Sequence, residues 1–434
     1  MSSLLDREFE RLLKDGYIDG SLYEKHNVKR GLRNANGTGV LVGLTKVADV
    51  KGYDIIDDKK IPAHGHLLYR GVDLYDLAFT DKDLYGFEKT IFLLLFGHTP
   101  NEEESAEFRQ LLADNCELPK GFIESVIMKN ASKDIMNSIQ KSILSLYSFD
   151  DEPDTNDPKK LVEKGISLIA KMPAIVAYSY QAKKYYLEGE SFHICPVNKE
   201  MSLAESMLYL ARGGKKYSYT EADSLDTAFI VHADHGGGNN SAFTGIVVAS
   251  TSTDIYSDIT ASLCSLKGPR HGGANRMVKD MMDASIKEIG VDASDEEISK
   301  LIDRILAKDF YDKSGLVYGI GHAVYTLSDP RCILLKQKCE SLSQEEKCVD
   351  KFNFYSRFEK IASEKLTKKN GKPYAANVDF YSGFAYEMLG IPCDLYTPIF
   401  AAARIAGWVA HIVETVMYCN KIIRPAFMYV GGEE

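Results

Sequence analysis

The chain has 434 residues, of which 45% are hydrophobic and 26% charged, and its formal net charge is −10. One hydrophobic core stops growing beyond roughly 250–300 residues, so the length predicts two domains, and the composition is typical of a soluble globular enzyme. The acidic balance excludes general nucleic-acid binding, which needs a basic face, although a few arginines in one cleft can still attract an anionic substrate.

The N-terminal sequence MSSLLDREFERLLKDG has early acidic residues and no apolar core of a signal peptide, so we expect a cytoplasmic protein. The longest apolar runs, such as IFLLLF at 91–96, are much shorter than the ~20 residues of a membrane span, and we expect no membrane segment. The eight cysteines are scattered without a CxxC pair, which predicts reduced thiols and no zinc site.

Apolar residues at three- and four-residue intervals predict that most of the chain is helical. Gly97 with Pro100 beyond it ends the first of these helices, and Thr397-Pro398 opens the last. Alternating patterns that favour strands occur only near the N-terminus, at 40–50 and 53–69. The predicted helices cover residues 84–96, 161–180, 199–212, 242–265, 277–289, 295–308, 332–341, 351–365 and 398–418.

The predicted fold is therefore all-α, with a large helical domain, a smaller helical domain and short β segments near the N-terminus. Residues from about 276 onward are more charged than their flanks, which indicates a separate small domain. We place the large domain at residues 1–275 and 380–434, and the small domain at 276–379.

Three histidine segments among glycines and one aspartate segment carry the chemistry of this sequence. Glycine lets backbone approach a ligand closely, and loops of this kind often bear functional residues. An imidazole can donate to a carbonyl oxygen and a carboxylate can accept a proton from carbon, so together they indicate proton abstraction beside a carbonyl. The segments are VHADHGGGN (231–239), GPRHGGAN (268–275), GIGHAVYTLSDPR (319–331) and NVDFYSG (377–383).

The first segment places His232 and His235 three residues apart, a spacing that can share a metal ion on a helix. It lacks the HExxH form and an evident third ligand, and a structural histidine is the alternative. In the second segment, His271 precedes a helical pattern, where the helix dipole would lower its pKa and keep it neutral, and a helix cap is the alternative.

The third segment supplies His322 and, nine residues later, Arg331, whose planar fork suits a carboxylate. It lacks the third glycine and preceding strand of a dinucleotide fingerprint, and a surface salt bridge is the alternative role for the arginine. Asp379 in the fourth segment has apolar neighbours, which raise the pKa of a carboxyl, and a helix cap is again the alternative.

Arg404 is the only fully charged side chain in TPIFAAARIAGWVAHIV (397–413), a helix whose small and apolar residues predict close packing. A buried guanidinium needs an anionic partner. A structural carboxylate could serve, and a substrate carboxylate fits better if Arg331 and Arg424 converge on the same place.

In this order the segments resemble those of the citrate synthase family, in its bacterial type. GIGHAVYTLSDPR fits the family signature G-x-G-H-x-V followed by D-P-R, and LLYRGVDLYDL (67–77) and LLLFGHTPNEEE (93–104) add two upstream matches. The resemblance runs from about residue 37 to the C-terminus and implies an acyltransferase, citrate synthase of the tricarboxylic acid cycle.

The resemblance also implies a role for each residue. Asp379 would remove a proton from the methyl group of acetyl-CoA, His271 would donate to the thioester oxygen, and His322 would polarise the ketone of oxaloacetate. Citryl-CoA would form and be cleaved by water. The substrate-binding residues would be His235, Arg331, Arg404 and, from the partner subunit of a homodimer, Arg424.

The family's small domain closes over oxaloacetate before the second substrate reacts, which excludes water. No metal or other cofactor is implied, since acetyl-CoA is a co-substrate. The sequence departs from the family at Gly236, Arg270, Arg276 and Thr326, the last at a place often held by a basic residue that contacts coenzyme A. Compensating charge for the coenzyme A phosphates could come from Lys368, Lys369 and Lys372.

Three alternatives are open at this point. A 2-methylcitrate synthase would use propionyl-CoA on the same scaffold, and one methylene changes discrimination by only ~1–3 kcal/mol. A metal-dependent hydrolase could be built on the HADH sequence. A non-catalytic binding protein could have kept the fold, although the presence of a base, two donors and three arginines argues against it.

Overall fold

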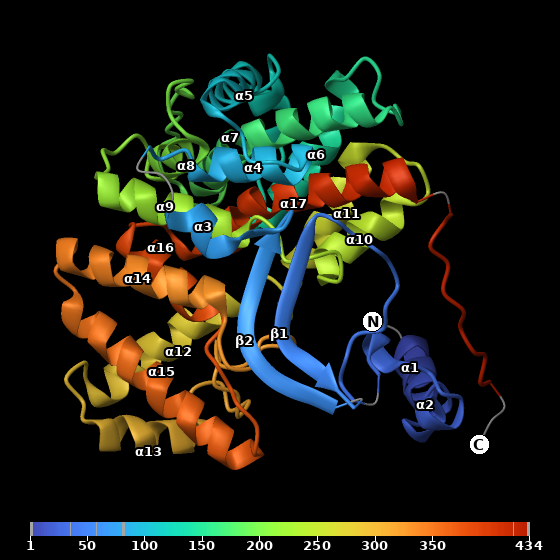
Figure 1. Ribbon diagram of the computed structural model, residues 1–434, viewed down its shortest axis with the longest axis vertical. Helices are drawn as coiled ribbons and strands as arrows, with labels where there is room; N and C mark the ends of the chain where they lie inside the picture. The colour runs from blue at the N-terminus through green and yellow to red at the C-terminus, as the bar shows by residue number, and fades with distance from the viewer. Residues whose placement is uncertain (1–2, 35, 58, 80–82, 420, 432–434) are drawn as a thin grey trace. The chain divides into compact units, whose positions relative to one another are not determined.

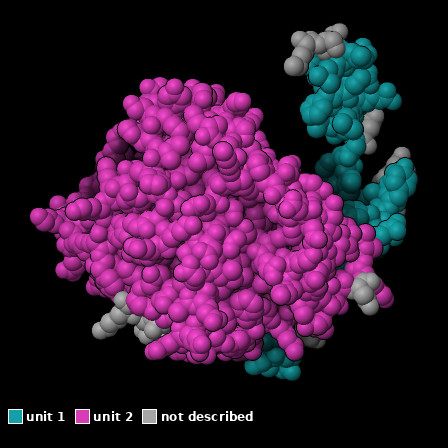
Figure 2. Space-filling model, turned by 90° about the horizontal axis from the view of Figure 1, so that it is seen from above, with its two compact units in different colours: residues 1–43, 55–61, 423–434 teal, residues 44–54, 62–422 magenta. Residues whose placement is uncertain are grey.

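The computed structural model describes residues 3–34, 36–57, 59–79, 83–419 and 421–431, and it is mostly helical, as predicted (Figure 1). The chain divides into two compact units (Figure 2). Unit 1 comprises residues 1–43, 55–61 and 423–434, and unit 2 comprises residues 44–54 and 62–422. The predicted small domain, 276–379, lies within unit 2, and its boundary with the large domain stays a prediction.

Unit 1 begins with α1 (Ser3–Asp15), followed by α2 (Ser21–Lys25) and the short η1 (Arg30–Leu32). The sequence analysis did not predict α1. Its side chains Leu5, Phe9 and Leu12 recur at intervals of four and three residues and so form one apolar stripe. Each of the three is more than half exposed.

A three-stranded sheet forms near the N-terminus, in the order β1 (Ala48–Ile56), β2 (Lys59–Tyr69) and β3 (Val72–Asp73). Strands β2 and β3 are antiparallel, with Tyr69 opposite Val72. The two residues between them, Arg70 and Gly71, both have positive φ, as a tight hairpin turn requires. The predicted short β segments therefore exist, but the strand begins at Ala48 rather than at residue 40.

Unit 2 contains the remaining helices. They are α3 (Leu74–Phe79), α4 (Gly86–Phe96), α5 (Glu102–Asn115), η2 (Ile123–Met128), α6 (Ile135–Leu146), η3 (Tyr147–Phe149), α7 (Pro158–Glu188), α8 (Leu203–Ala211), α9 (Tyr219–His232), α10 (Asn240–Ala249), α11 (Ile255–Lys267), α12 (Ala274–Ile289), α13 (Asp295–Leu306), α14 (Pro330–Glu345), α15 (Val349–Asn370), α16 (Asp379–Met388), η4 (Cys393–Leu395) and α17 (Tyr396–Tyr418).

Local sequence explains where many of these helices start. A Ser-x-x-Glu motif forms a capping box at α8, α9 and α13, where serine and glutamate satisfy each other's free backbone N–H groups. Asp-Pro pairs start α7 and α14, with the aspartate carboxylate as cap and proline in the first turn. Helix α4 ends at Gly97 in the left-handed conformation, as predicted.

Helix α17 is the central helix of unit 2 and packs against α4, α7, α9, α10 and α11 (Figure 1). Every residue from Pro398 to Val413 is buried, including Arg404 and Trp408. Among the described residues, Cys393–Tyr418 is the one helical segment long and apolar enough to cross a membrane. However, 89% of its most apolar window is buried inside the protein, as in a core helix.

Two local predictions were wrong. The single helix expected over 242–265 is two helices, because Ser252 has positive φ and Asp254 caps the start of α11. The hydroxyl of Thr397 does not cap α17, which begins one residue earlier; it donates to the carbonyl oxygen of Gly272 at 2.8 Å. This bond ties the last helix to the segment that carries His271.

Candidate functional site

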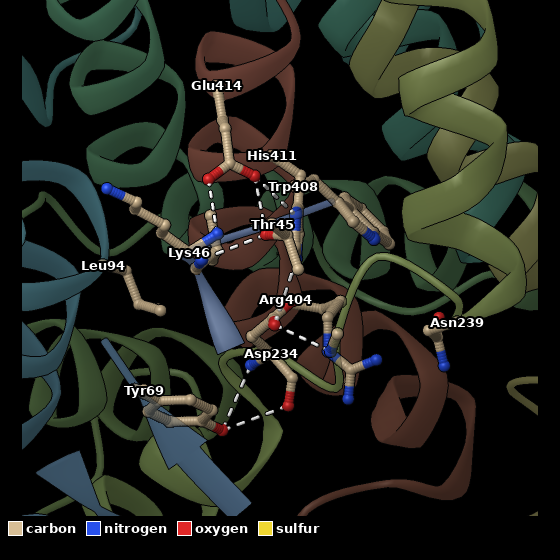
Figure 3. Close-up of polar contacts among 12 residues, drawn as sticks. Thr45, Lys46, Tyr69, Leu94, Asp234, Asn239, Arg404, Trp408, His411 and Glu414 are labelled. Carbon is tan, nitrogen blue, oxygen red and sulfur yellow. Dashed lines mark hydrogen bonds and ion pairs between the residues drawn. The ribbon is translucent and has the colours of Figure 1, made fainter. Parts of the chain in front are cut away.

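The loop that carries His235 follows α9 and is held against α17 through its backbone (Figure 3). Arg404 Nε donates to the carbonyl oxygen of His232, and the N–H of Gly407 donates to the carbonyl oxygen of Ala233 at 3.0 Å. A Cβ atom at Gly407 would lie 2.3 Å from a carboxylate oxygen of Asp234, so only glycine allows this close approach.

His235, His322 and Tyr325 form one aromatic cluster. The ring centres of His235 and His322 are 5.2 Å apart, and Tyr325 stacks on His322 with centres 4.9 Å apart. The Nδ1 atom of His322 accepts hydrogen bonds from the backbone N–H groups of Val324 and Tyr325, each at 3.1 Å. A neutral His322 therefore carries its proton on Nε2, where it can be donated to a ligand.

Arg331 is buried and bound to Asp329, the residue that caps α14. Its Nε atom donates to one carboxylate oxygen of Asp329 at 3.0 Å, and one terminal nitrogen donates to the other at 2.7 Å. The same carboxylate accepts from the backbone N–H of Val378 at 3.2 Å. Asp329 thereby joins the third sequence segment to the fourth, directly before Asp379.

Asp379 is the first residue of α16, and the side chain of Asn377 holds the backbone that leads into it. The side chain of Asn377 donates to the carbonyl oxygen of Gly321 at 2.8 Å and accepts from the N–H of Asp379 at 3.0 Å. Burial raises the pKa of Asp379 to about 6, against the opposing effects of Arg331 and Arg404. This is the behaviour expected from its apolar sequence neighbours.

His271 precedes α12, and its Nε2 atom lies 3.0 Å from the hydroxyl oxygen of Ser241. The same hydroxyl accepts from the indole N–H of Trp408, on α17, at 3.2 Å. Burial, and next the positive charge of Arg404, lower the pKa of His271 to about 4. The imidazole is therefore neutral near pH 7, for these reasons rather than through the helix dipole alone.

Arg404 is 1% exposed, and burial lowers its pKa to about 10. Its guanidinium carbon lies 4.6 Å from the ring centre of Phe400. Both terminal nitrogens of the guanidinium lack a hydrogen-bond partner among the described residues. A buried cation with two unsatisfied donor groups favours binding of an anion from outside the chain.

Six of the candidates in unit 2 act on one another electrostatically: His235, His271, His322, Arg331, Asp379 and Arg404. Burial first, and then Arg331, His322, Arg404 and His271, lower the pKa of His235 well below its usual range. Arg331 and Arg404 likewise act on Asp379. Residues far apart in the chain, from His235 to Arg404, are therefore brought into one region.

The histidines of the HADH sequence do not form a metal site. The ring of His232 packs on Phe400, with centres 4.3 Å apart, whereas the ring of His235 packs on His322. Over the described ranges, no three histidine, cysteine or acidic side chains are placed to hold a metal ion. The geometry gives no support to the metal-dependent hydrolase.

The remaining candidates lie outside this group. Arg424 is exposed in the C-terminal segment of unit 1. Lys368, Lys369 and Lys372 are exposed in the last turn of α15 and just beyond it. Lys372 lies over the ring of Tyr374 at 5.5 Å, and a Cβ atom at Gly321 would meet that ring at 3.0 Å.

Thr326, which stands where a basic residue is common in the family, has a structural partner. Its hydroxyl lies 3.0 Å from the carbonyl oxygen of Ala63 and 3.1 Å from its N–H, and it also contacts the carbonyl oxygen of Gly52. The loop that carries His322 is thereby attached to strands β1 and β2.

Several residues of the site were missed by the sequence analysis. Ser241 and Tyr325 contact candidate histidines, and Trp408 contacts Ser241. Asp234 contacts His411 and acts on Arg404 through its charge. One signal was available for His411, because it lies seven residues after Arg404 and so on the same face of α17.

Comparison with known proteins shows the family of this chain. The family model described as "Citrate synthase, C-terminal domain" matches residues 35–426. The chain belongs to the citrate synthase family. The citrate synthase of Haloferax volcanii is 32% identical, over 94% of this chain and 97% of that protein. A 2-methylcitrate synthase of Corynebacterium glutamicum is 29% identical, over 93% and 98%.

A solved structure shows the same fold. It is the ternary complex of the citrate synthase of Thermoplasma acidophilum with carboxymethyl coenzyme A and oxaloacetate. This chain aligns to it with a TM-score of 0.75 and 26% identity, over 94% of this chain and 97% of that one. The chain is thus an acyltransferase of the citrate synthase family, with the mostly helical fold of that family.

Proposed function

We propose that this enzyme condenses acetyl-CoA with oxaloacetate and hydrolyses the resulting citryl-CoA to citrate and coenzyme A. The observation that carries the proposal is Arg404, a buried guanidinium whose terminal nitrogens have no partner among the described residues and whose charge reaches Asp379 and His271. An anionic ketone bound there would lie beside a base and two neutral imidazoles. The complex of the Thermoplasma acidophilum enzyme with oxaloacetate supports the choice of anion.

Asp379 is the proposed base. Its pKa of about 6 leaves it ionised at pH 7 and makes it a stronger base than an exposed aspartate. It would take a proton from the methyl group of acetyl-CoA, which leaves an enol or enolate whose oxygen needs a donor. The nucleophilic carbon would then attack the ketone carbon of oxaloacetate.

His271 and His322 are the proposed donors. His271, whose Nε2 atom lies 3.0 Å from the hydroxyl oxygen of Ser241, would donate a ring N–H to the thioester oxygen. His322, with its proton on Nε2, would donate to the ketone oxygen, which becomes the hydroxyl of citryl-CoA. Water would then cleave the thioester and release coenzyme A.

Arg331, Arg404 and His235 would hold oxaloacetate, together with Arg424 of the partner subunit. We infer a homodimer, because large apolar side chains remain exposed on unit 1, among them Phe9 on α1 at 55% and Phe427, three residues after Arg424, at 94%. The exposed Lys372 with Lys368 and Lys369 would attract the coenzyme A phosphates. A cytoplasmic enzyme of the tricarboxylic acid cycle is the setting we propose.

A 2-methylcitrate synthase is the second candidate, which the relative from Corynebacterium glutamicum supports. The two reactions differ by one methyl group on the acyl chain, so the same residues serve both.

Oxaloacetate-dependent release of the thiol of coenzyme A tests the proposal, with acetyl-CoA and propionyl-CoA compared at equal concentration. A higher kcat/KM with acetyl-CoA is the expected result. A preference for propionyl-CoA would transfer the assignment to the second candidate, and thiol release that ignores oxaloacetate would refute both.

A further inference from the structure

A buried Asp234–His411 pair lies near Arg404 and has no part in the chemistry proposed above (Figure 3). The Nε2 atom of His411 is 3.2 Å from a carboxylate oxygen of Asp234, and the two side chains are 1% and 0% exposed. The same carboxylate oxygen accepts from the backbone N–H of Gly236 at 2.8 Å. Asp234 is therefore held by two donors on one oxygen.

A second carboxylate lies on the other side of His411. Its Nδ1 atom is 4.0 Å from the carboxylate of Glu414, one turn further along α17. Glu414 in turn accepts from the hydroxyl of Thr45 at 2.6 Å and from the backbone N–H of Lys46 at 2.7 Å (Figure 3). The imidazole thus lies between two carboxylates, and among the described residues it hydrogen-bonds to Asp234 but not, through Nδ1, to Glu414.

The carboxylate of Asp234 influences the pKa of Arg404 through its charge but does not hydrogen-bond to the terminal nitrogens of Arg404. After burial, Asp234 is the largest influence on the pKa of Arg404, and it favours the charged guanidinium. Burial raises the pKa of Asp234, but His411, Arg404 and the N–H of Gly236 lower it more, so the carboxylate form is retained. The terminal nitrogens of Arg404 nevertheless have no partner among the described residues.

We propose that His411 is a positioning residue: it holds the carboxylate of Asp234 away from the guanidinium of Arg404, which leaves that guanidinium open to a substrate carboxylate. The inference rests on the proposed function, in which Arg404 binds oxaloacetate. Asp234 then balances the buried charge of Arg404 and does not compete with the substrate. Without His411, the freed carboxylate would pair with Arg404 and act as an internal competitor.

The test compares His411→Leu, which removes the donor, with His411→Gln, which keeps a neutral donor. Loss of a hydrogen bond to a charged group changes an equilibrium by roughly tenfold or more, so we expect KM for oxaloacetate to rise about tenfold or more in His411→Leu. We expect kcat to change much less, and His411→Gln to stay near the parent. Val413→Ala, buried on the same helix, is the control for loss of packing.

A double variant distinguishes competition by the Asp234 carboxylate for Arg404 from a general packing defect. Asparagine carries no charge, so Asp234→Asn in the His411→Leu background should restore most of the affinity for oxaloacetate. His411→Asn, whose side chain is too short to reach Asp234, keeps the test available if His411→Leu does not fold.

The proposal is overturned if His411→Leu has the parental KM for oxaloacetate and only a lower unfolding midpoint, as expected of Val413→Ala. It is also overturned if Asp234→Asn deepens the defect instead of relieving it. A parent enzyme without oxaloacetate-dependent thiol release would instead refute the proposed function and, with it, this role of His411.

Discussion

Replacing Asp379 with asparagine should abolish condensation and at the same time stabilise the folded enzyme. The amide cannot accept the methyl proton, so we expect kcat to fall by several orders of magnitude while oxaloacetate still binds. The gain in stability has a separate origin. The folded protein keeps a carboxylate in a place where burial raises its pKa from 3.8 to about 6.

The size and sign of this effect follow from linkage. A tenfold change in an equilibrium constant is about 1.4 kcal/mol, so the raised pKa of Asp379 corresponds to about 3 kcal/mol of unfolding free energy. Between pH 3.8 and about 6 the folded state binds more protons than the unfolded state, so stability falls as the pH rises through this window. The asparagine side chain of the Asp379→Asn variant does not titrate, so the unfolding free energy of the variant does not fall for this reason as the pH rises.

Urea denaturation of parent and Asp379→Asn at pH 7.5 and pH 4 measures the effect, because the first pH lies above the window and the second lies at its lower edge. We expect the variant to gain up to about 3 kcal/mol at the higher pH and little at the lower one. Glu364→Gln, an exposed carboxylate on α15, is the matched control and should change stability little at either pH. An equal gain at both pH values, or none, would refute a buried carboxylate with a raised pKa.

Three further predictions concern activity. The kcat/KM value should fall about tenfold for each pH unit below about 6, because the base must be ionised, and a rate independent of pH from 5 to 7 would contradict this role of Asp379. Arg404→Leu should raise KM for oxaloacetate by about tenfold to a hundredfold, whereas an unchanged KM would place the substrate elsewhere. Activity should survive exhaustive treatment with EDTA, and its loss, restored by added metal, would revive the metal-dependent alternative.

The predicted helices and the candidate catalytic segments depend on local signals that can be read from the sequence. Amphipathic periodicity and capping motifs act within one or two turns, so most of the long helices of unit 2 could be predicted. Asp379 and the three histidines stood out because each has glycines or apolar residues beside it. The break between α10 and α11 was missed because the residue with positive φ there is Ser252, and only a glycine would have signalled a break in the sequence.

The supporting residues could not be predicted in the same way. The contact between Asp234 and His411 joins positions 177 apart in the chain, and that between Ser241 and Trp408 joins positions 167 apart. Neither pair has a local pattern, since each residue alone is compatible with an ordinary helix or loop.

The sequence by itself therefore determined the helical class and the family, and it supplied the candidates for the base and the donors together with the buried arginine of α17. Only the tertiary structure decided which groups each of these residues faces. The reason is physical: periodicity and caps depend on neighbours a few residues away, whereas the pKa of Asp379, the proton on His322 and the open donors of Arg404 depend on burial and on charges brought together by folding.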